Sequence, residues 1–93
     1  MNINIPPVTN ISTALKIYYT HSEIGNQQIT ELFGKRSSAT VSRLKRAVKN
    51  EMARREIMSY GLNKVNTSIA YEVWGLDVDD LERRIKKLKN LDL

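Results

Sequence analysis

The sequence predicts an all-α fold, one domain of four to five helices. Ninety-three residues supply enough chain for one hydrophobic core but not for two. Most of the apolar residues recur at intervals of three and four, which is the spacing of helices that bury one face. Only two prolines and four glycines are present, so few positions interrupt such helices.

The N-terminal elements follow from local signals. Residues 1–8 are expected to form an extended arm, because Pro6 and Pro7 disfavour a helix before them. The domain proper is then 9–93. Its first helix is predicted from about residue 10 to 20, with Thr9 or Asn10 as the N-cap. The apolar stripe of this helix is Ile11, Ala14, Leu15, Tyr18 and Tyr19.

Two further helices are predicted in the middle of the chain. A short one runs from Asn26, which can cap it, to Phe33, and Gly34 ends it. A longer one begins at Ser37 or Ser38 and is expected to continue to about residue 59. Its buried side is formed by Val41, Leu44, Val48 and Met52.

The last third of the chain contains one ambiguous segment. Residues 61–67 are predicted to be a loop, and 68–74 a helix in which Trp74 is a core anchor for the last helix. The dense β-branched and aromatic residues of 69–74 also allow a short strand or wing there. A final helix over 77–91 has its acids first and its bases later, which complements the helix dipole.

Positive charge is concentrated in one stretch. The whole chain has a net charge of +5. Residues 35–55 contain eight bases and one acid, Glu51, so this stretch carries +7 and the remainder −2. Such a local patch is what a polyanion binder needs, although a solvated helix face has the same composition.

The layout of residues 28–48 predicts a helix-turn-helix. A short helix, a glycine, a polar turn and a second amphipathic helix follow in the order QITELFGKRSSATVSRLKRAV. In this motif the first helix braces the second, the glycine permits a sharp turn, and polar turn residues cap the second helix at the DNA groove.

This segment resembles the helix-turn-helix of bacterial and phage DNA-binding regulators, winged-helix relatives included. In them a glycine turn precedes a recognition helix of the "TVSR-L" type. The resemblance assigns Ile29 and Phe33 to buried positions of the bracing helix, and Val41 and Leu44 to those of the recognition helix. The interval from Gly34 to Val41 is one residue longer than in the tightest form of the motif, which suggests a looser turn.

A helical wheel sorts the residues of the recognition helix by size and charge. Small residues and two arginines share the side opposite the buried stripe, with Asn50 beside them. We expect Arg43 and Arg46 to reach guanine edges and Asn50 to recognise adenine. Lysines at the side and the turn residues would contact phosphates. The expected DNA-binding residues are Lys35, Arg36, Ser37, Ser38, Ala39, Ser42, Arg43, Lys45, Arg46, Lys49 and Asn50.

Two uses of the final helix remain open. Its apolar residues step by three, four and three, which is the spacing of a two-stranded coiled coil. They are Val78, Leu81, Ile85 and Leu88. The stripe is shorter than two heptads, so it serves equally well for packing inside the domain as for a homodimer.

The sequence lacks the residues that most enzymes, metal sites and membrane spans require. One histidine, His21, and no cysteine leave no metal pair or catalytic dyad, so we expect no enzyme, no metal and no cofactor. No apolar run approaches the roughly 20 residues of a membrane span, and we expect a cytoplasmic, nucleoid-associated protein.

The sequence thus predicts sequence-selective binding of double-stranded DNA, as a small transcriptional regulator of bacterial or mobile-element origin that acts as a homodimer. One rival is an accessory protein in replication, excision or packaging, or an RNA binder. Another is a helical adaptor whose basic face docks an acidic protein.

Overall fold

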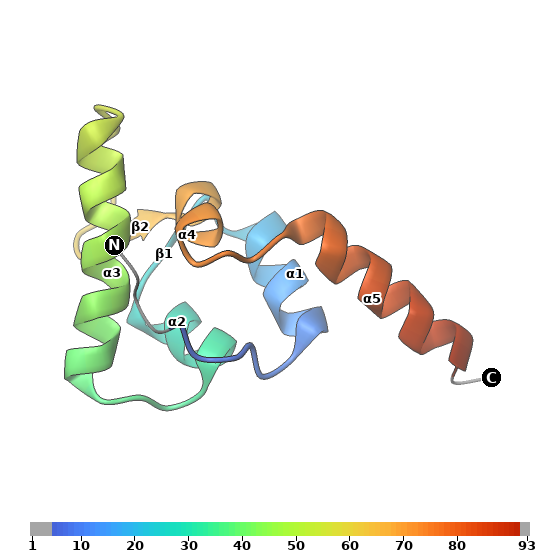
Figure 1. Cartoon of the computed structure of the whole chain (residues 1–93). Helices are drawn as coiled ribbons and strands as arrows, with labels where there is room; N and C mark the ends of the chain where they lie inside the picture. Colours follow the sequence, from blue (N-terminus) through green and yellow to red (C-terminus); the bar gives the residue numbers. More distant parts are fainter. Residues whose placement is uncertain (1–4, 92–93) are drawn as a thin grey trace.

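The computed structural model describes residues 5–91, which form five helices and one two-stranded sheet (Figure 1). This confirms the predicted helical fold class. In chain order the elements are α1 (Ile11–Thr20), β1 (Glu23–Ile24), α2 (Asn26–Phe33), α3 (Ser38–Arg54), β2 (Val65–Asn66), α4 (Thr67–Val73) and α5 (Val78–Leu91).

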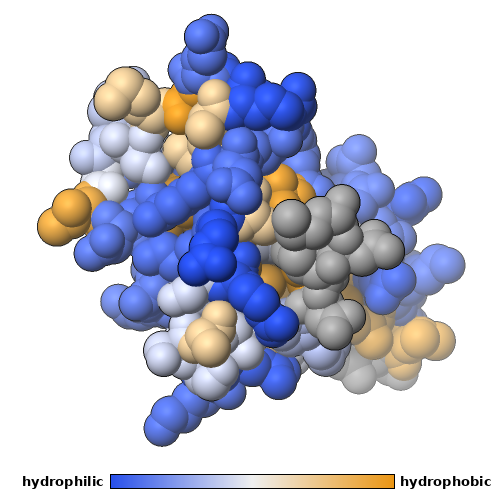
Figure 2. Space-filling model, turned by 60° about the vertical axis from the view of Figure 1, so that its left-hand side comes forward, coloured by the Kyte–Doolittle hydropathy of each residue, from blue (hydrophilic) through white to orange (hydrophobic). Residues whose placement is uncertain are grey.

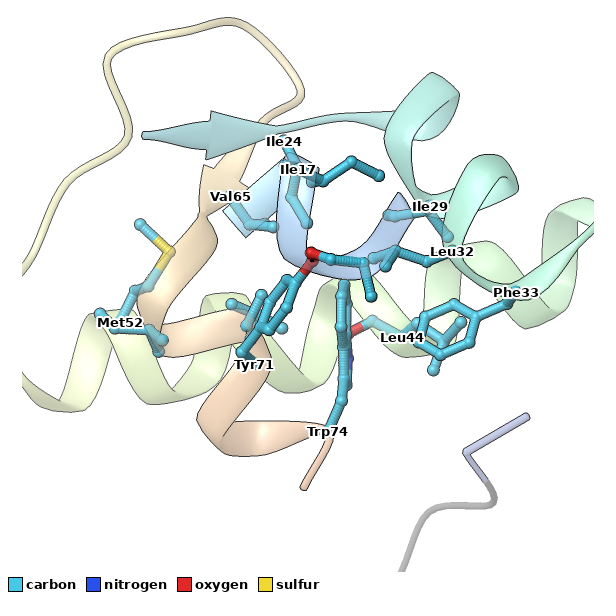
Figure 3. Close-up of a cluster of buried hydrophobic side chains, with 14 of the residues drawn as sticks. Ile17, Ile24, Ile29, Leu32, Phe33, Leu44, Met52, Val65, Tyr71 and Trp74 are labelled. Carbon is cyan, nitrogen blue, oxygen red and sulfur yellow. Dashed lines mark hydrogen bonds between the residues drawn. The ribbon is translucent and has the colours of Figure 1, made fainter. Parts of the chain in front are cut away.

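The short helix α4 lies at the centre of the fold, where two aromatic side chains link it to its neighbours (Figure 3). The buried Tyr71 hydroxyl donates a hydrogen bond of 2.6 Å to the Ala14 carbonyl of α1. At the end of α4, the Trp74 indole N–H donates to the Leu44 carbonyl of α3 at 3.1 Å. Trp74 is therefore a core residue as predicted, but it anchors α3 rather than the last helix.

Burial on several sides explains the ambiguous segment 69–74. Ile69, Ala70 and Tyr71 are all buried, and α4 contacts both α3 and β2. A helix enclosed in this way carries apolar residues around much of its circumference, which blurs its period and mimics a buried strand. The segment is helical, and the second of the two strands, β2, lies just before it at Val65–Asn66.

The core combines residues from every helix and both strands. The rings of Phe33 and Trp74 meet edge to face with their centroids 5.4 Å apart. The buried apolar residues are Ala14, Ile17, Ile24, Ile29, Leu32, Phe33, Leu44, Val48, Met52, Val65, Ile69, Ala70, Tyr71, Trp74 and Leu81. The predicted buried stripe of the third helix is confirmed for Leu44, Val48 and Met52, while Val41 is half-buried.

The two strands join the connection between α1 and α2 to the connection between α3 and α4. They pair antiparallel, with Ile24 opposite Val65 and Glu23 opposite Asn66. Ile24 and Val65 are fully buried, so the sheet has an apolar side toward the core. The pairing holds the segment between α1 and α2 against the segment that follows α3.

The N-cap of α1 matches the prediction, and that of α2 does not. The side chain of Asn10 accepts from the Thr13 N–H at 3.1 Å, as expected for the N-cap of α1. In α2 the N-cap is Gly25, whose N–H donates to the Gln28 side chain at 2.9 Å. The prediction that Asn26 caps α2 is therefore wrong. The Asn26 side chain instead accepts a hydrogen bond from Lys45 of α3.

The third helix ends earlier than predicted, at Arg54 instead of about residue 59. Glu56 adopts a left-handed conformation with φ 59°, and the Ile57 N–H donates back to the Met52 carbonyl at 2.9 Å. These hydrogen bonds close the helix in the way that a glycine usually does. Because a glutamate takes that position here, Gly61 was the only visible stop signal in the sequence.

The N-terminal arm and α5 lie at the edges of the domain. Of the predicted arm, residues 1–4 lie outside the described part, while Ile5 and Val8 pack against the core. Helix α5 packs on α1 through the buried Leu81, and its second half extends away from the domain (Figure 1). The molecule is consequently elongated, with extents of 45 × 26 × 24 Å.

Candidate nucleic-acid interface

The outer face of α3 is exposed and polar (Figure 2). It forms one side of the molecule, opposite the end where α5 projects (Figure 1). Ten of the eleven residues expected at the DNA are exposed, and they are Lys35, Arg36, Ser37, Ser38, Ala39, Ser42, Arg43, Arg46, Lys49 and Asn50. The predicted face is thus exposed to solvent at these ten residues.

The buried side of α3 is what aims this face outward. Leu44, Val48 and Met52 enter the core, and α3 makes its broadest contacts with α4 and β2. The Trp74 indole adds a hydrogen bond to the Leu44 carbonyl at the middle of the helix. The bracing that the sequence assigned to α2 is therefore supplied largely by α4, which the motif does not include.

The turn before α3 is built from backbone conformation and caps. Gly34 has a φ of 81°, a region that side-chain-bearing residues rarely adopt. The Arg36 Nε donates to the Phe33 carbonyl at 3.0 Å, which satisfies the end of α2. The Ser37 hydroxyl accepts from the Thr40 N–H at 3.2 Å and caps α3, as predicted for this pair of serines.

Lys45 differs from the other ten residues, because only 9% of its surface is exposed. Its ammonium donates to the Asn26 side chain at 3.1 Å and so joins α3 to α2. Burial lowers the pKa of the Lys45 ammonium, and the nearby positive charge of Lys49 lowers it further. Lys45 thus makes a structural contact that the sequence did not predict, and it is the least exposed of the expected DNA-binding residues. A helical wheel of α3 could not predict the burial of Lys45, because its partner Asn26 belongs to another helix, α2.

A neighbouring loop, overlooked in the sequence, lies along the same face. Asn63 lines a hollow together with four residues of α3, namely Ser42, Lys45, Arg46 and Lys49. Asn63 has a left-handed φ of 60°, a conformation that asparagine tolerates better than most residues. Its amide and the Arg46 guanidinium thus share one depression. The only sequence signal was an asparagine in a predicted loop.

The C-terminal end of α3 contributes less positive charge than its composition suggests. Arg54 and Arg55 both contact the Glu51 carboxylate, and Arg55 also contacts Glu72 of α4 at 2.8 Å. Hydrogen bonds from Arg54 and then Arg55 lower the pKa of Glu51 to about 2. These two arginines are therefore neutralised locally, and the unopposed bases of α3 lie in its first three turns and the turn before it.

The predicted dimerisation stripe is divided by the fold. Leu81 is buried against α1, and Val78 and Ile85 are half-buried. Leu88 is 53% exposed, and Leu91 beyond it is also exposed. The first half of the stripe thus packs inside the domain, which leaves Ile85, Leu88 and Leu91 for any contact with a second copy.

Other chemistry receives little support from the described residues. Within residues 5–91, no group of three or more histidine or acidic side chains is placed to hold a metal ion. His21 lies at the end of α1, where its Nδ1 contacts the Thr20 hydroxyl at 2.9 Å. A groove beside Tyr18, Tyr19 and Leu76 is open and shallow.

Comparisons of the chain with protein-family models, with curated protein sequences and with solved structures give no match. Among the described helices, none combines the length and the apolar character that crossing a bilayer requires.

Proposed function

We propose that this protein binds double-stranded DNA, with α3 in the major groove. The observation that carries the proposal is the division of α3 into a buried apolar side and an exposed side on which small residues and cations are sorted. The major groove is wide enough for one helix, and the small Ala39 and Ser42 permit a close approach near the start of α3.

Recognition would proceed in three steps that use different residues. The basic patch first attracts the polyanion and speeds encounter. Lys35 and Arg36 of the turn, together with Lys49, then contact phosphates and fix the register of the helix. Arg43, Arg46 and Asn50 finally contact base edges, since guanidinium groups pair with guanine and asparagine with adenine. This is the action of a small transcriptional regulator of the helix-turn-helix kind that the sequence resembles.

A homodimer on a two-fold site follows from the size of the module. One helix of this size contacts few base pairs, and related modules gain specificity by pairing two half-sites about 34 Å apart. The exposed leucines of α5 offer the second copy an apolar surface. Their surroundings contain five bases, Arg83, Arg84, Lys86, Lys87 and Lys89.

Titration of labelled duplex DNA at several salt concentrations tests the proposal. We expect the logarithm of the binding constant to fall linearly with the logarithm of salt, by about 0.9 per phosphate contacted. Absence of binding to duplex at low salt would overturn the proposal. Tighter binding to single-stranded RNA than to duplex would favour the rival RNA-binding function.

Two lysines of α3 provide a matched pair for this titration. Lys49→Met and Lys45→Met each remove one positive charge from the same helix, but only Lys49 is exposed. We expect Lys49→Met to reduce the salt slope by about 1 for every duplex sequence, and Lys45→Met to leave it unchanged. Equal effects of the two variants would show that only net charge matters, and not the face of α3.

A further inference from the structure

The loop between α3 and β2 exposes large apolar side chains at consecutive and alternate positions. We name residues 56–64 the apolar loop. Tyr60 is 98% exposed, Leu62 90% and Met58 83%, while Ile57 is 38% exposed. Single exposed apolar residues are ordinary in proteins, but a cluster of this density usually marks a contact surface.

The apolar loop is held by hydrogen bonds in one conformation. Both oxygens of the Glu23 carboxylate accept from its backbone, one from the Tyr60 N–H and the other from the Gly61 N–H, each at 2.7 Å. The Ser59 hydroxyl donates to the Lys64 carbonyl at 2.7 Å. Because Glu23 belongs to β1, these bonds fix the loop to the sheet, and the side chains of Met58, Tyr60 and Leu62 remain exposed.

The position of the apolar loop links it to the proposed DNA face. Asn63 lines a hollow with Ser42, Lys45, Arg46 and Lys49, so this end of the loop lies against the cationic side of α3. At its other end, Glu56, Ile57 and Met58 line a hollow with Lys49. Tyr60 lines an adjoining hollow that shares Glu56, Ile57 and Met58 and also contains Glu23. A ligand that covers Arg46 and Lys49 would therefore meet the apolar loop as well. Such a ligand must present negative charge and an apolar surface side by side.

We propose that Tyr60 and Leu62 contact a base step of the duplex next to the groove that α3 occupies, and partly unstack it. A DNA duplex places phosphates immediately beside the apolar faces of its bases, and an inserted aromatic or aliphatic side chain opens a step and bends the helix axis. The preordered loop lowers the conformational entropy lost on insertion. This inference rests on the proposed DNA binding and adds deformation of the duplex to it.

DNA bending measured by energy transfer between the two ends of a labelled duplex tests this inference. The wild-type complex should shorten the end-to-end distance in a way that fits a bend of about 20–90°. A 2-aminopurine base at the opened step should gain fluorescence. For the variant Tyr60→Ser with Leu62→Ser, we expect the bend and the fluorescence gain to disappear and the affinity to fall roughly tenfold.

Two controls separate the apolar loop from general effects. Tyr19→Ser removes another exposed aromatic side chain, 63% exposed, from α1, outside the apolar loop and the leucines of α5, and should change neither bending nor affinity. Glu23→Ala keeps Tyr60 and Leu62 but frees the loop backbone, and should reduce bending less than the double variant. Thermal unfolding of each variant verifies that the fold persists, which the exposure of the substituted side chains makes the expected result.

The outcomes distinguish this inference from the proposed function. If the wild type binds duplex without bending it, or if the double variant bends it as the wild type does, the inference is overturned while DNA binding stands. If the wild type does not bind duplex DNA at all, both the proposed function and this inference are overturned. Vesicles with anionic headgroups serve as a second probe, and wild-type binding to them that needs Tyr60, without any DNA bending, would assign the loop to a membrane surface instead.

Discussion

Helices α3 and α5 are the two basic helices of the molecule, and they lie at opposite ends of it (Figure 1). Helix α3 buries Leu44, Val48 and Met52 and carries no large apolar residue on its outer face. Helix α5 buries only Leu81 and exposes Leu88 and Leu91 among its bases. Each helix contains five bases, but the two present different surfaces, one polar and seated on the core, the other amphipathic and projecting. The difference indicates that charge alone does not identify a DNA-facing helix.

The largest expected difference between the two helices is in stability. Trp74→Ala removes the ring that packs on Phe33 and the hydrogen bond to Leu44 of α3. We expect the free energy of unfolding to fall by about 3–5 kcal/mol, which approaches the total stability of a small domain. Leu88→Ala on the exposed part of α5 should change it by less than about 0.5 kcal/mol. Urea denaturation followed by circular dichroism measures both, and equal effects would contradict the seating of α3 described above.

The second prediction concerns affinity for DNA. Arg43→Ala and Arg46→Ala should each weaken binding to the preferred site by about 1–3 kcal/mol and relax its specificity. Arg83→Ala and Arg84→Ala on α5 are matched controls and should have little effect. Competition binding with random duplexes measures both quantities. Intact binding in the two α3 variants would show that the proposed groove face is wrong.

Salt should act in opposite directions on the two helices. The bases around Leu88 repel those of a second copy, so added salt should strengthen a dimer formed through α5 while it weakens DNA binding through α3. Leu88→Lys removes apolar surface and adds a charge, so it should shift the protein toward monomer without unfolding it. Sedimentation velocity without DNA measures this. A dimer insensitive to Leu88→Lys would place the contact between copies elsewhere.

The smallest expected effect is a local dependence on pH. The folded pKa of Glu51 is lowered to about 2 by Arg54 and Arg55, below its ordinary value of 4.5. The stabilisation of the end of α3 is therefore fully present above about pH 4.5 and is lost as the pH falls toward 2. Amide resonances of residues 52–57, followed by NMR during acid titration, report this loss. Glu51→Gln should abolish the dependence, because it removes the titrating group.

Local signals predicted much of the fold and of the site. The end of α2 and the start of α3 follow from Gly34 and Ser37, whose roles depend on neighbouring residues alone. The outward side of α3 follows from its period. These features are recoverable from sequence because they are decided within one or two turns of helix.

The features that the sequence did not reveal depend on distant contacts. Lys45 looks like any other surface lysine until Asn26 accepts its hydrogen bond, 19 residues away. The apolar loop is ordered by Glu23, which precedes Tyr60 by 37 residues. The early end of α3 depends on a left-handed glutamate, Glu56, that no propensity favours. In each case a tertiary contact or an uncommon backbone conformation overrides the local pattern.

The hydrogen bond from Trp74 to Leu44 also makes the protein its own optical probe. Trp74 is the only tryptophan in the chain, and its indole lies between α4, α3 and the Phe33 ring. Its emission wavelength consequently reports on the seat of α3 without any label. A shift on adding DNA would reveal movement of that helix within the domain, whereas unchanged emission would indicate that the domain docks as a rigid body.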